Sequence, residues 1–195
     1  LRELRAHLAP AARSAAERAI RANLGRLGLF RRGAHVALYL PMPGEVDLRP
    51  CVEVARRCGA RIYVPRIASR RRRRMLFAPW TPGAPRRTNA FGIVEPGTAA
   101  GARPVIGLDV VVLPMVGFDL RGNRLGMGAG YYDRALRRRL ERGAAWRRPL
   151  LVGVAFACQQ LEDIPASPWD VPLDLVVTER GVIVTGRNPN RSTDR

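Results

Sequence analysis

A glycine-rich stretch near the middle of the chain carries residue types suited to phosphate chemistry. Gly126, Gly128 and Gly130 alternate over five residues, so the backbone can bend there and approach a ligand without interference from Cβ atoms. Free amides in such a loop bind phosphate oxygens, and Arg124 just before it supplies a planar cationic donor. A helix predicted from Tyr131 to about Glu141 follows, and its N-terminus also favours anions. The alternative is a tight turn that only caps this helix.

Two aspartates could complete a magnesium–nucleotide site with this loop. Asp133 opens the predicted helix, and Asp170 follows Pro168 and Trp169. Proteins usually hold Mg²⁺ beside phosphates through carboxylate oxygens, so the two aspartates could share one cation. Taken singly, Asp133 is better explained as a first-turn carboxylate that stabilises its helix, and Asp170 as a turn residue. The magnesium interpretation therefore requires the two segments to meet in the fold.

The composition excludes several common kinds of site. All 34 basic residues are arginine, so the chain has no lysine for a Schiff base or for a Walker-type phosphate loop. A dinucleotide-binding fingerprint is excluded because Tyr131 stands where its third glycine belongs. The three cysteines are too scattered for a disulfide framework, and together with two histidines they predict no zinc site. Any phosphate must therefore be held by arginine, backbone amides or a metal ion.

The net charge of +18 raises the alternative of a basic nucleic-acid-binding module without catalytic activity. Its main support is the run of five arginines from Arg70 to Arg74. Single-strand nucleic-acid sites interleave such cations with aromatic rings. This run contains none, and aromatic residues make up only 6% of the chain. We therefore predict a solvated hairpin tip between two strands, and no specific nucleic-acid partner.

The elements that must position these residues follow an α/β pattern. A helix over residues 1–27 precedes an apolar strand at 35–40, a helix at 48–58 and a strand at 61–65, which is the spacing of a strand–helix–strand unit with a parallel pair. The most apolar strand, at 108–113, is typical of a central strand buried on both faces. Further strands are predicted at 75–78, 150–156, 174–178 and 181–185, whereas 88–96 is predicted to be irregular.

The whole pattern predicts a single α/β domain over residues 1–186, with a mostly parallel central sheet and helices on both faces. A polar tail at 187–195 is predicted to be disordered. The N-terminus is charged and lacks the apolar region of a secretory signal, and no apolar run reaches the roughly 18 residues that cross a bilayer. We expect a cytoplasmic monomer that does not contact a membrane.

Ligands of open α/β sheets bind beyond the carboxyl ends of the strands. We therefore expect the site where four connecting segments leave those ends. They are Pro41–Asp47 with Glu45, Met115–Asp133 with the glycine loop, Ala157–Gln160, and Pro165–Pro172 with Asp170.

The central segment strongly resembles the signature of the 5-formyltetrahydrofolate cyclo-ligase (methenyltetrahydrofolate synthetase) family. It reads Val112-Leu-Pro-Met-Val-Gly-Phe-Asp-Leu-Arg-Gly-Asn-Arg-Leu-Gly-Met-Gly-Ala-Gly-Tyr-Tyr-Asp133. The resemblance extends from residue 1 to about 185, with supporting segments in family order at Tyr39–Glu45, Phe91–Pro96, Gly153–Phe156 with Gln159, and Trp169–Glu179.

This resemblance implies an ATP- and Mg²⁺-dependent ligase that converts 5-formyltetrahydrofolate, with or without a polyglutamate tail, into 5,10-methenyltetrahydrofolate, ADP and phosphate. The formyl oxygen would attack the γ-phosphate of ATP, and N10 of the folate would then close the ring. The implied fold is a three-layer, open-sheet α/β fold of the NagB/RpiA-like type.

Site residues are implied by position. ATP would be bound by Arg124, Leu125, Gly126, Met127, Gly128, Ala129, Gly130, Tyr131 and Tyr132. The folate would be bound by Leu40 and Glu45, with Glu45 accepting from ring N–H donors, and by Met127, Gly128, Ala129, Gly130 and Tyr131. Arg124 and Tyr131 would be the catalytic residues, and Asp133 and Asp170 would bind Mg²⁺.

The chain departs from the family pattern at two places. The family usually opens with a lysine about four residues before an arginine, both of which reach the ATP phosphates. This chain has no lysine, and neither Arg2 nor Arg5 fits that spacing, so the sequence assigns no phosphate contact to this segment. Ala129 also stands where the family commonly has glycine or lysine.

Overall fold

The structure is a computed structural model that describes residues 2–81, 83–90, 92–141 and 148–185; the tail predicted at 187–195 lies outside them. The helices are α1 (Arg2–Ala6), α2 (Pro10–Arg26), α3 (Arg49–Arg57) and α4 (Tyr131–Glu141), with 3₁₀ turns η1 (Val105–Gly107) and η2 (Ala157–Gln159). The strands are β1 (His35–Ala37), β2 (Arg61–Ser69), β3 (Arg74–Pro79), β4 (Arg86–Thr88), β5 (Val94–Pro96), β6 (Val110–Pro114), β7 (Gly117–Phe118), β8 (Arg124–Leu125), β9 (Leu150–Val154), β10 (Leu175–Thr178) and β11 (Gly181–Val184).

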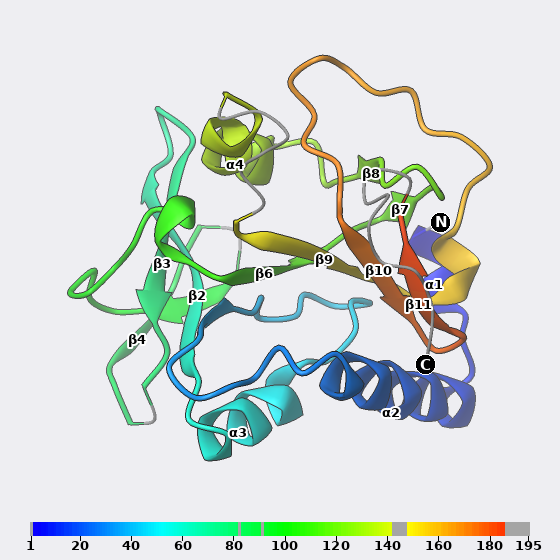
Figure 1. Ribbon diagram of the computed structural model, residues 1–195, viewed down its shortest axis with the longest axis horizontal. Coiled ribbons are helices and arrows are strands. Elements are labelled where there is room, and N and C mark those ends of the chain that lie inside the picture. Colours follow the sequence, from blue (N-terminus) through cyan, green and yellow to red (C-terminus); the bar gives the residue numbers. More distant parts are fainter. Residues whose placement is uncertain (1, 82, 91, 142–147, 186–195) are drawn as a thin grey trace.

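One seven-stranded sheet organises the molecule, in the order β11-β10-β9-β6-β1-β2-β3. Its five inner strands run parallel, and β11 and β3 pair antiparallel at the two edges (Figure 1). The parallel pairing of β1 with β2 confirms the predicted strand–helix–strand unit. A mostly parallel sheet is therefore confirmed, and its inner strands end at a common edge.

Helices cover both faces of this sheet, as predicted. Below the sheet in Figure 1, α2 and α3 pack their buried side chains, such as Leu24 and Ala55, against one core. Above it, α4 and η1 close a second core through Leu136 and Val105. The central strand β6 contributes alternate residues to the two cores, Val112 to the lower and Val111 to the upper, which explains its continuous apolar run.

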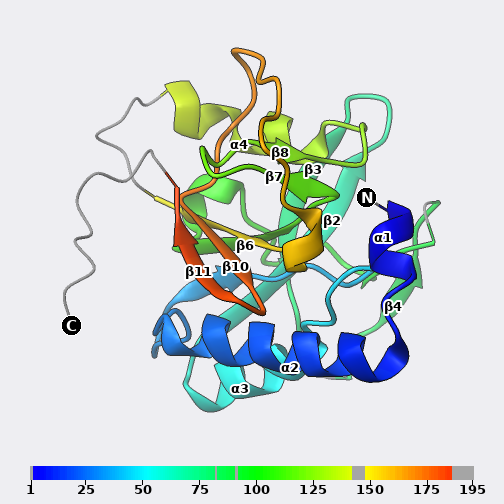
Figure 2. The same ribbon diagram turned by 90° about the vertical axis from the view of Figure 1, so that its right-hand side faces the viewer.

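The predicted helix over residues 1–27 is wrong, because the structure has two helices there. Pro10 begins α2, since its missing N–H costs nothing in the first turn of a helix but cannot continue the preceding one. The separate helix α1 packs against η2, as Figures 1 and 2 both show. The break brings α1 to the edge where the parallel strands end, whereas one straight helix would have carried its residues away from that edge.

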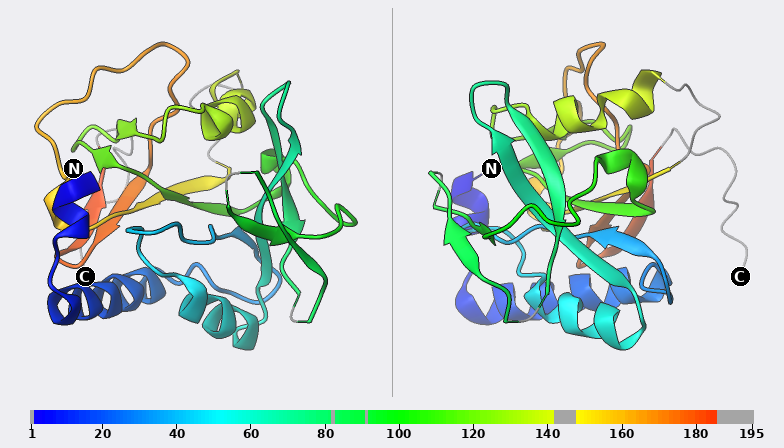
Figure 3. Two further views of the ribbon diagram at one scale, coloured as in Figure 1. Left: turned by 180° about the vertical axis from the view of Figure 1, so that it is seen from behind. Right: turned by 90° about the vertical axis from the view of Figure 1, so that its left-hand side faces the viewer.

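Two hairpins lie at the side of the sheet where β2 and β3 form its edge. The run from Arg70 to Arg74 forms the tip between β2 and β3 and the first residue of β3, which confirms the predicted hairpin (Figure 3). Residues 88–96, predicted to be irregular, instead contribute to the antiparallel pair β4–β5. The side chain of Glu95 is fully buried there and accepts hydrogen bonds from Arg87 and from the amide of Ile67. These long-range contacts stabilise a hairpin that the local sequence pattern does not predict.

Within the described residues, no helix is both long and apolar enough to cross a lipid bilayer.

Candidate active site

Three connections leave the carboxyl ends of neighbouring parallel strands and meet at one edge of the sheet. They follow β1, β6 and β9, as the sequence predicted. The segment Pro165–Pro172 is different: it is the last part of the return from β9 to the start of β10, so the prediction that it follows a strand end is wrong. It nevertheless reaches the same region, because the amide of Leu173 donates to the carbonyl of Gly122 at 2.9 Å.

A short hairpin, β7–β8, presents the glycine loop. Its turn is closed by Asp119, whose buried carboxylate accepts hydrogen bonds from the amides of Arg121, Asn123 and Ile164 and from the Asn123 side chain. Burial by itself raises the pKa of the Asp119 carboxyl, but these four hydrogen bonds outweigh it and hold the pKa below its ordinary value. Gly122 completes the turn, since its φ is +90° and a Cβ there would lie 2.7 Å from the Leu173 carbonyl oxygen.

The glycine loop itself has open space around it. Gly128 and Gly130 adopt φ values of +83° and +65°, which L side chains rarely adopt. A Cβ on Gly126 or Gly128 would meet no atom within 4 Å, so a ligand can approach the backbone there. The carbonyls of Ala129 and Gly130 accept hydrogen bonds from the Arg134 side chain.

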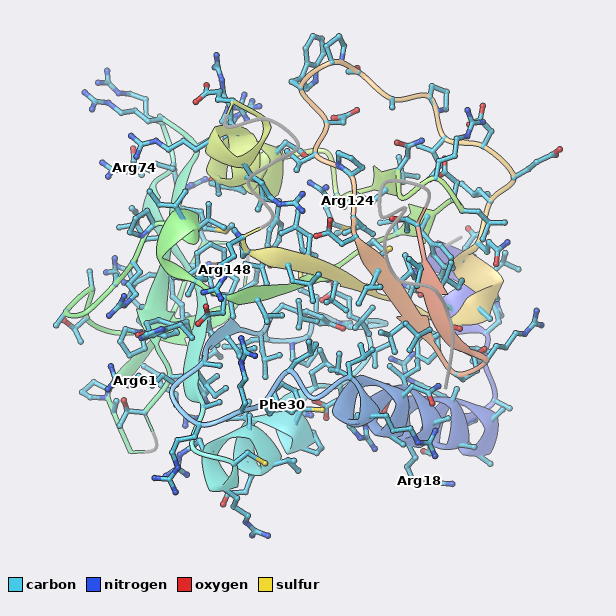
Figure 4. The ribbon with its side chains drawn as sticks, in the orientation of Figure 1. Arg18, Phe30, Arg61, Arg74, Arg124 and Arg148 are labelled. Atoms are coloured by element: carbon cyan, nitrogen blue, oxygen red, sulfur yellow. The ribbon has the colours of Figure 1, made fainter. Side chains whose placement is uncertain are left out.

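Arg124 is the charged side chain that ties this loop to the rest of the site. Only 7% of its side chain is exposed. Its guanidinium pairs with the Asp133 carboxylate on α4 and donates to the carbonyl of Val171 on the return to β10. In Figure 4 it lies above the sheet, on the opposite side from Arg18 of α2. Arg124 therefore brings together the two segments that carry Asp133 and Asp170.

Each of these aspartates has one carboxylate oxygen engaged. Oδ1 of Asp133 accepts from Arg124, and Oδ2 of Asp170 accepts from the amide of Ser167 at 2.8 Å. The second oxygen of each has no hydrogen-bond partner in the part of the chain that the structure describes. No cluster of three or more His, Cys, Asp or Glu that could hold a metal occurs among the described residues, so any ion here would need further oxygens from phosphate or water.

A second group of candidate residues lies in the connection after β1. Glu45 is 9% exposed and its Oε2 accepts from the amide of Met42 at 2.9 Å. Burial raises the pKa of the Glu45 carboxyl, although the Met42 hydrogen bond and the charge of Arg5 act in the opposite direction. Leu40, just after β1, is partly exposed in the same connection.

Tyr132 connects the two groups electrostatically. Its pKa is raised by burial and by the Glu45 carboxylate, and lowered by Arg124. Glu45 and Arg124 therefore both lie within electrostatic range of this hydroxyl. Tyr131 and Tyr132 also pack against the upper core, which fixes the start of α4.

The structure adds Arg5, which sequence spacing had set aside. Arg5 is 4% exposed, and its Nη1 donates to the carbonyl of Met115 at 3.3 Å, at the beginning of the β6–β7 connection. Gly44 makes room for it, because a Cβ at Gly44 would lie 3.2 Å from the Arg5 Nε. Gln159 donates to the same Met115 carbonyl at 2.8 Å and to the Val116 carbonyl at 3.0 Å. Only the break between α1 and α2, at Pro10, could have indicated where Arg5 points.

Arg124 joins the glycine loop to the segments of Asp133 and Asp170, and Arg5 joins the segment of Glu45 to the connection after β6. The structure describes the positions of Arg124 through Asp133, Leu40, Glu45 and Asp170, and adds Arg5 and Gln159 to them. Which of these residues contact ligands stays a prediction.

Comparisons with known proteins agree with this architecture. A family model described as the 5-formyltetrahydrofolate cyclo-ligase family matches residues 1–179. The chain is 33% identical to a 5-formyltetrahydrofolate cyclo-ligase of Haemophilus influenzae over 181 residues, covering 91% of this chain and 93% of the relative. It is 37% identical to the enzyme of that name from Escherichia coli over 146 residues, covering 73% and 76%.

Solved structures give the same result. An NMR structure of 5,10-methenyltetrahydrofolate synthetase from Aquifex aeolicus superposes with a TM-score of 0.79 at 32% identity, covering all of this chain and 92% of that one. A synthetase of the same name from Mycoplasma pneumoniae superposes with a TM-score of 0.70 at 25% identity, covering 91% and 93%. By sequence and by fold, this chain belongs to the 5-formyltetrahydrofolate cyclo-ligase family.

Proposed function

We propose that this protein catalyses the ATP-dependent cyclisation of 5-formyltetrahydrofolate to 5,10-methenyltetrahydrofolate, with release of ADP and phosphate. One observation carries the proposal most directly. Arg5 joins the Glu45 segment to the connection that carries the glycine loop, because it donates to the Met115 carbonyl at 3.3 Å and lies against Gly44, the neighbour of Glu45. A phosphoryl donor at the loop and a pterin beside Glu45 would therefore lie close together, as the reaction requires.

The phosphate side is built from the loop and from arginine. Residues Arg124 to Tyr132 would bind ATP, with the open backbone around Gly126 and Gly128 facing the phosphates. Phosphoryl transfer needs neutralisation of the charge spread over the transferring oxygens more than it needs a nucleophilic side chain. The guanidinium of Arg124 is held on two sides, so it can supply that charge with little reorganisation.

Asp133 and Asp170 fit a role in holding Mg²⁺. Their segments are joined through Arg124, and each carboxylate keeps one oxygen without a partner among the described residues. When bound, Mg²⁺ would neutralise charge on the nucleotide phosphates. The two aspartates would hold it, while Arg124 keeps Asp133 in place.

The folate side is built around Glu45 and Leu40, with the glycine loop from Met127 to Tyr131 as the opposite wall. A carboxylate in a buried setting can accept from the N–H donors of a pterin ring and so orient it. The partly exposed Leu40 offers an apolar contact beside it. Tyr131 and Arg124 would contact the reacting groups.

The proposed reaction has two steps. The formyl oxygen attacks the γ-phosphorus of ATP and the bond to ADP breaks. N10 of the folate next attacks the activated formyl carbon, the carbon–oxygen bond to phosphate breaks, and N10 loses its proton. The chain's own residues orient the two substrates, exclude water and stabilise the charge that develops on the phosphoryl oxygens.

The direct test follows the ultraviolet absorbance of the methenyl product with purified protein. We expect product only when 5-formyltetrahydrofolate, ATP and Mg²⁺ are all present. A protein that binds RNA tightly but makes no product would support the basic nucleic-acid module instead, with a salt titration of binding as its signature. Family membership and the open glycine loop beside the buried Arg124 favour the ligase. The cytoplasmic location and the monomeric state stay predictions.

A further inference from the structure

A single arginine on α2, Arg13, contacts α1, the connection after β1 and the connection after β9. Its Nη2 donates to the carbonyl of Glu45 at 2.7 Å, and its Nη1 donates to the carbonyl of Arg5 at 3.4 Å. Its Nε pairs with Glu17 at 3.2 Å, and the guanidinium lies over the ring of Phe156, 5.2 Å from its centroid. Every nitrogen of this guanidinium therefore has a partner.

The two backbone carbonyls that Arg13 bonds belong to residues assigned to the site. They belong to Glu45 and Arg5, and the charge of Arg5 acts to lower the pKa of the Glu45 carboxyl. Gly44 lets the two approach, with 3.2 Å between Arg5 Nε and the position of a Cβ at Gly44. Because one rigid, planar group bonds both backbones, the separation between the Arg5 guanidinium and the Glu45 carboxylate depends on Arg13.

We propose that Arg13 is a positioning residue for the folate: without contacting substrate, it fixes the distance between the Arg5 and Glu45 segments. This inference rests on the proposed function. It assigns Arg13 no role toward ATP, because none of its contacts with the described residues involves the glycine loop or the return segment that bonds Arg124.

The same helix provides a matched control in Arg21. Arg21 lies near the other oxygen of Glu17, at 3.7 Å, and donates to the carbonyl of Asp47 at 3.0 Å, so it also joins α2 to the β1–α3 connection. Its side chain is 22% exposed, against 26% for Arg13. Within the part of the chain that the structure describes, Arg21 has neither a bond to α1 nor a ring contact. The two arginines therefore differ in the features that the proposal uses.

The experiment compares Arg13→Ala, Arg13→Lys and Arg21→Ala in steady-state cyclisation, with folate affinity measured without ATP. For Arg13→Ala we expect the KM for 5-formyltetrahydrofolate to rise about 10-fold, since small misplacements of orienting groups have large effects. The KM for ATP should stay within about twofold. Arg13→Lys should recover part of the loss, because a lysine can reach one carbonyl but cannot span both. Arg21→Ala should leave both KM values within about twofold of wild type.

Thermal unfolding of each variant separates positioning from simple loss of stability. Equal shifts in Tm for Arg13→Ala and Arg21→Ala, with a folate defect only in the former, support the proposal. Equal folate defects in the two variants, or a rise in the KM for ATP that matches the rise for folate, would overturn it. If Arg13→Ala does not fold, Arg13→Lys decides: a raised folate KM supports the proposal and a wild-type value overturns it. An inactive wild-type protein would instead refute the proposed function.

Discussion

Arginine occupies two contrasting settings in this molecule. In the candidate site, Arg5 is 4% exposed and the side chain of Arg124 is 7% exposed, and each donates to a carbonyl. At the β2–β3 hairpin, Arg71–Arg74 are all exposed, and none of the ion pairs of the described residues involves them. Figure 4 shows Arg124 above the middle of the sheet and Arg74 on the outer hairpin.

The comparison shows that partners, more than the number of charges, determine what an arginine can do. A buried guanidinium must be paired, because leaving it unpaired costs several kcal/mol, and pairing holds it in one geometry. Exposed guanidinium groups keep their water, move freely and are screened within about 10 Å at 0.1 M salt. The buried, paired arginines of the site are therefore suited to chemistry, and the exposed hairpin arginines to nonspecific electrostatic attraction.

The largest expected effect comes from removing Arg124. Arg124→Ala should lower kcat/KM by about 100-fold or more, the scale of losing one preorganised donor to a transition state. Arg124→Lys should also lose activity, because it keeps the charge but not the planar fork. Folate affinity without ATP should change far less. The measurement pairs single-turnover rates with folate binding by fluorescence.

The neighbouring Arg121 is the control for this prediction. It lies on the same hairpin, but its side chain is 69% exposed and its ion pair is with Asp163, which is also exposed. Arg121→Ala should stay within about twofold of wild-type kcat/KM, as expected of a surface ion pair. Equal losses of rate and of folate affinity in Arg124→Ala would mean that Arg124 only shapes the loop, and an unchanged rate would remove it from the site.

The next effect is on stability, at the turn that holds Arg124. Asp119→Asn should cost about 1.5–3 kcal/mol of unfolding free energy at pH 7, because an amide leaves donors unpaired that now bond a charged carboxylate. The Asp119 pKa is lowered in the folded protein. Its contribution is therefore complete above the unfolded pKa of about 3.9 and is lost as the pH falls through the lower folded value.

Urea unfolding at several pH values checks this prediction, with Asp163→Asn as the exposed control. The difference between wild type and Asp119→Asn should shrink as the pH drops below about 4. A difference that is independent of pH would show that the carboxylate charge contributes nothing, and that only the shape of the side chain matters.

A smaller effect is expected from the two aspartates. Asp170→Asn should raise the Mg²⁺ concentration needed for half-maximal cyclisation about 10-fold, with partial rescue at high Mg²⁺. Asp133→Asn should behave similarly but lose more activity, because it also releases Arg124. Titration of initial rates with Mg²⁺ at saturating ATP makes the comparison. Wild-type Mg²⁺ dependence in both variants would refute the assignment.

The smallest effect on catalysis is expected at the hairpin. Replacing Arg70–Arg74 with Ser should leave cyclisation of the monoglutamate substrate within about twofold, while weakening nonspecific polyanion binding and its salt dependence. Rates with mono- and polyglutamylated folate, and RNA binding across a salt series, test this. Collapse of monoglutamate turnover in a folded variant would remove the contrast between the two regions. A selective loss with polyglutamylated folate would assign the run to the acidic tail.

Local patterns in the sequence were sufficient for much of this description. The apolar run around β6, the glycine alternation from Gly126 to Gly130 and the arginine run predicted a buried central strand, a bending loop and a hairpin tip, and the structure has all three. The long signature ending at Asp133 was specific enough to indicate the family. Each of these features depends on residues that are close together in the chain, so it can be predicted from the sequence alone.

Long-range contacts decided what the sequence left open. Arg5 contacts Met115 across 110 residues, and Arg13 contacts Glu45 across 32. Arg124 bonds the carbonyl beside Asp170, 47 residues away, and thereby joins the two aspartates that spacing alone could not connect. The β4–β5 hairpin forms over a stretch with weak strand character, with Glu95 bonded to the amide of Ile67. The physical reason is common to these cases. A buried charged or polar group bonds to the partner that the tertiary fold brings near it, and the periodicity of the sequence does not predict that partner.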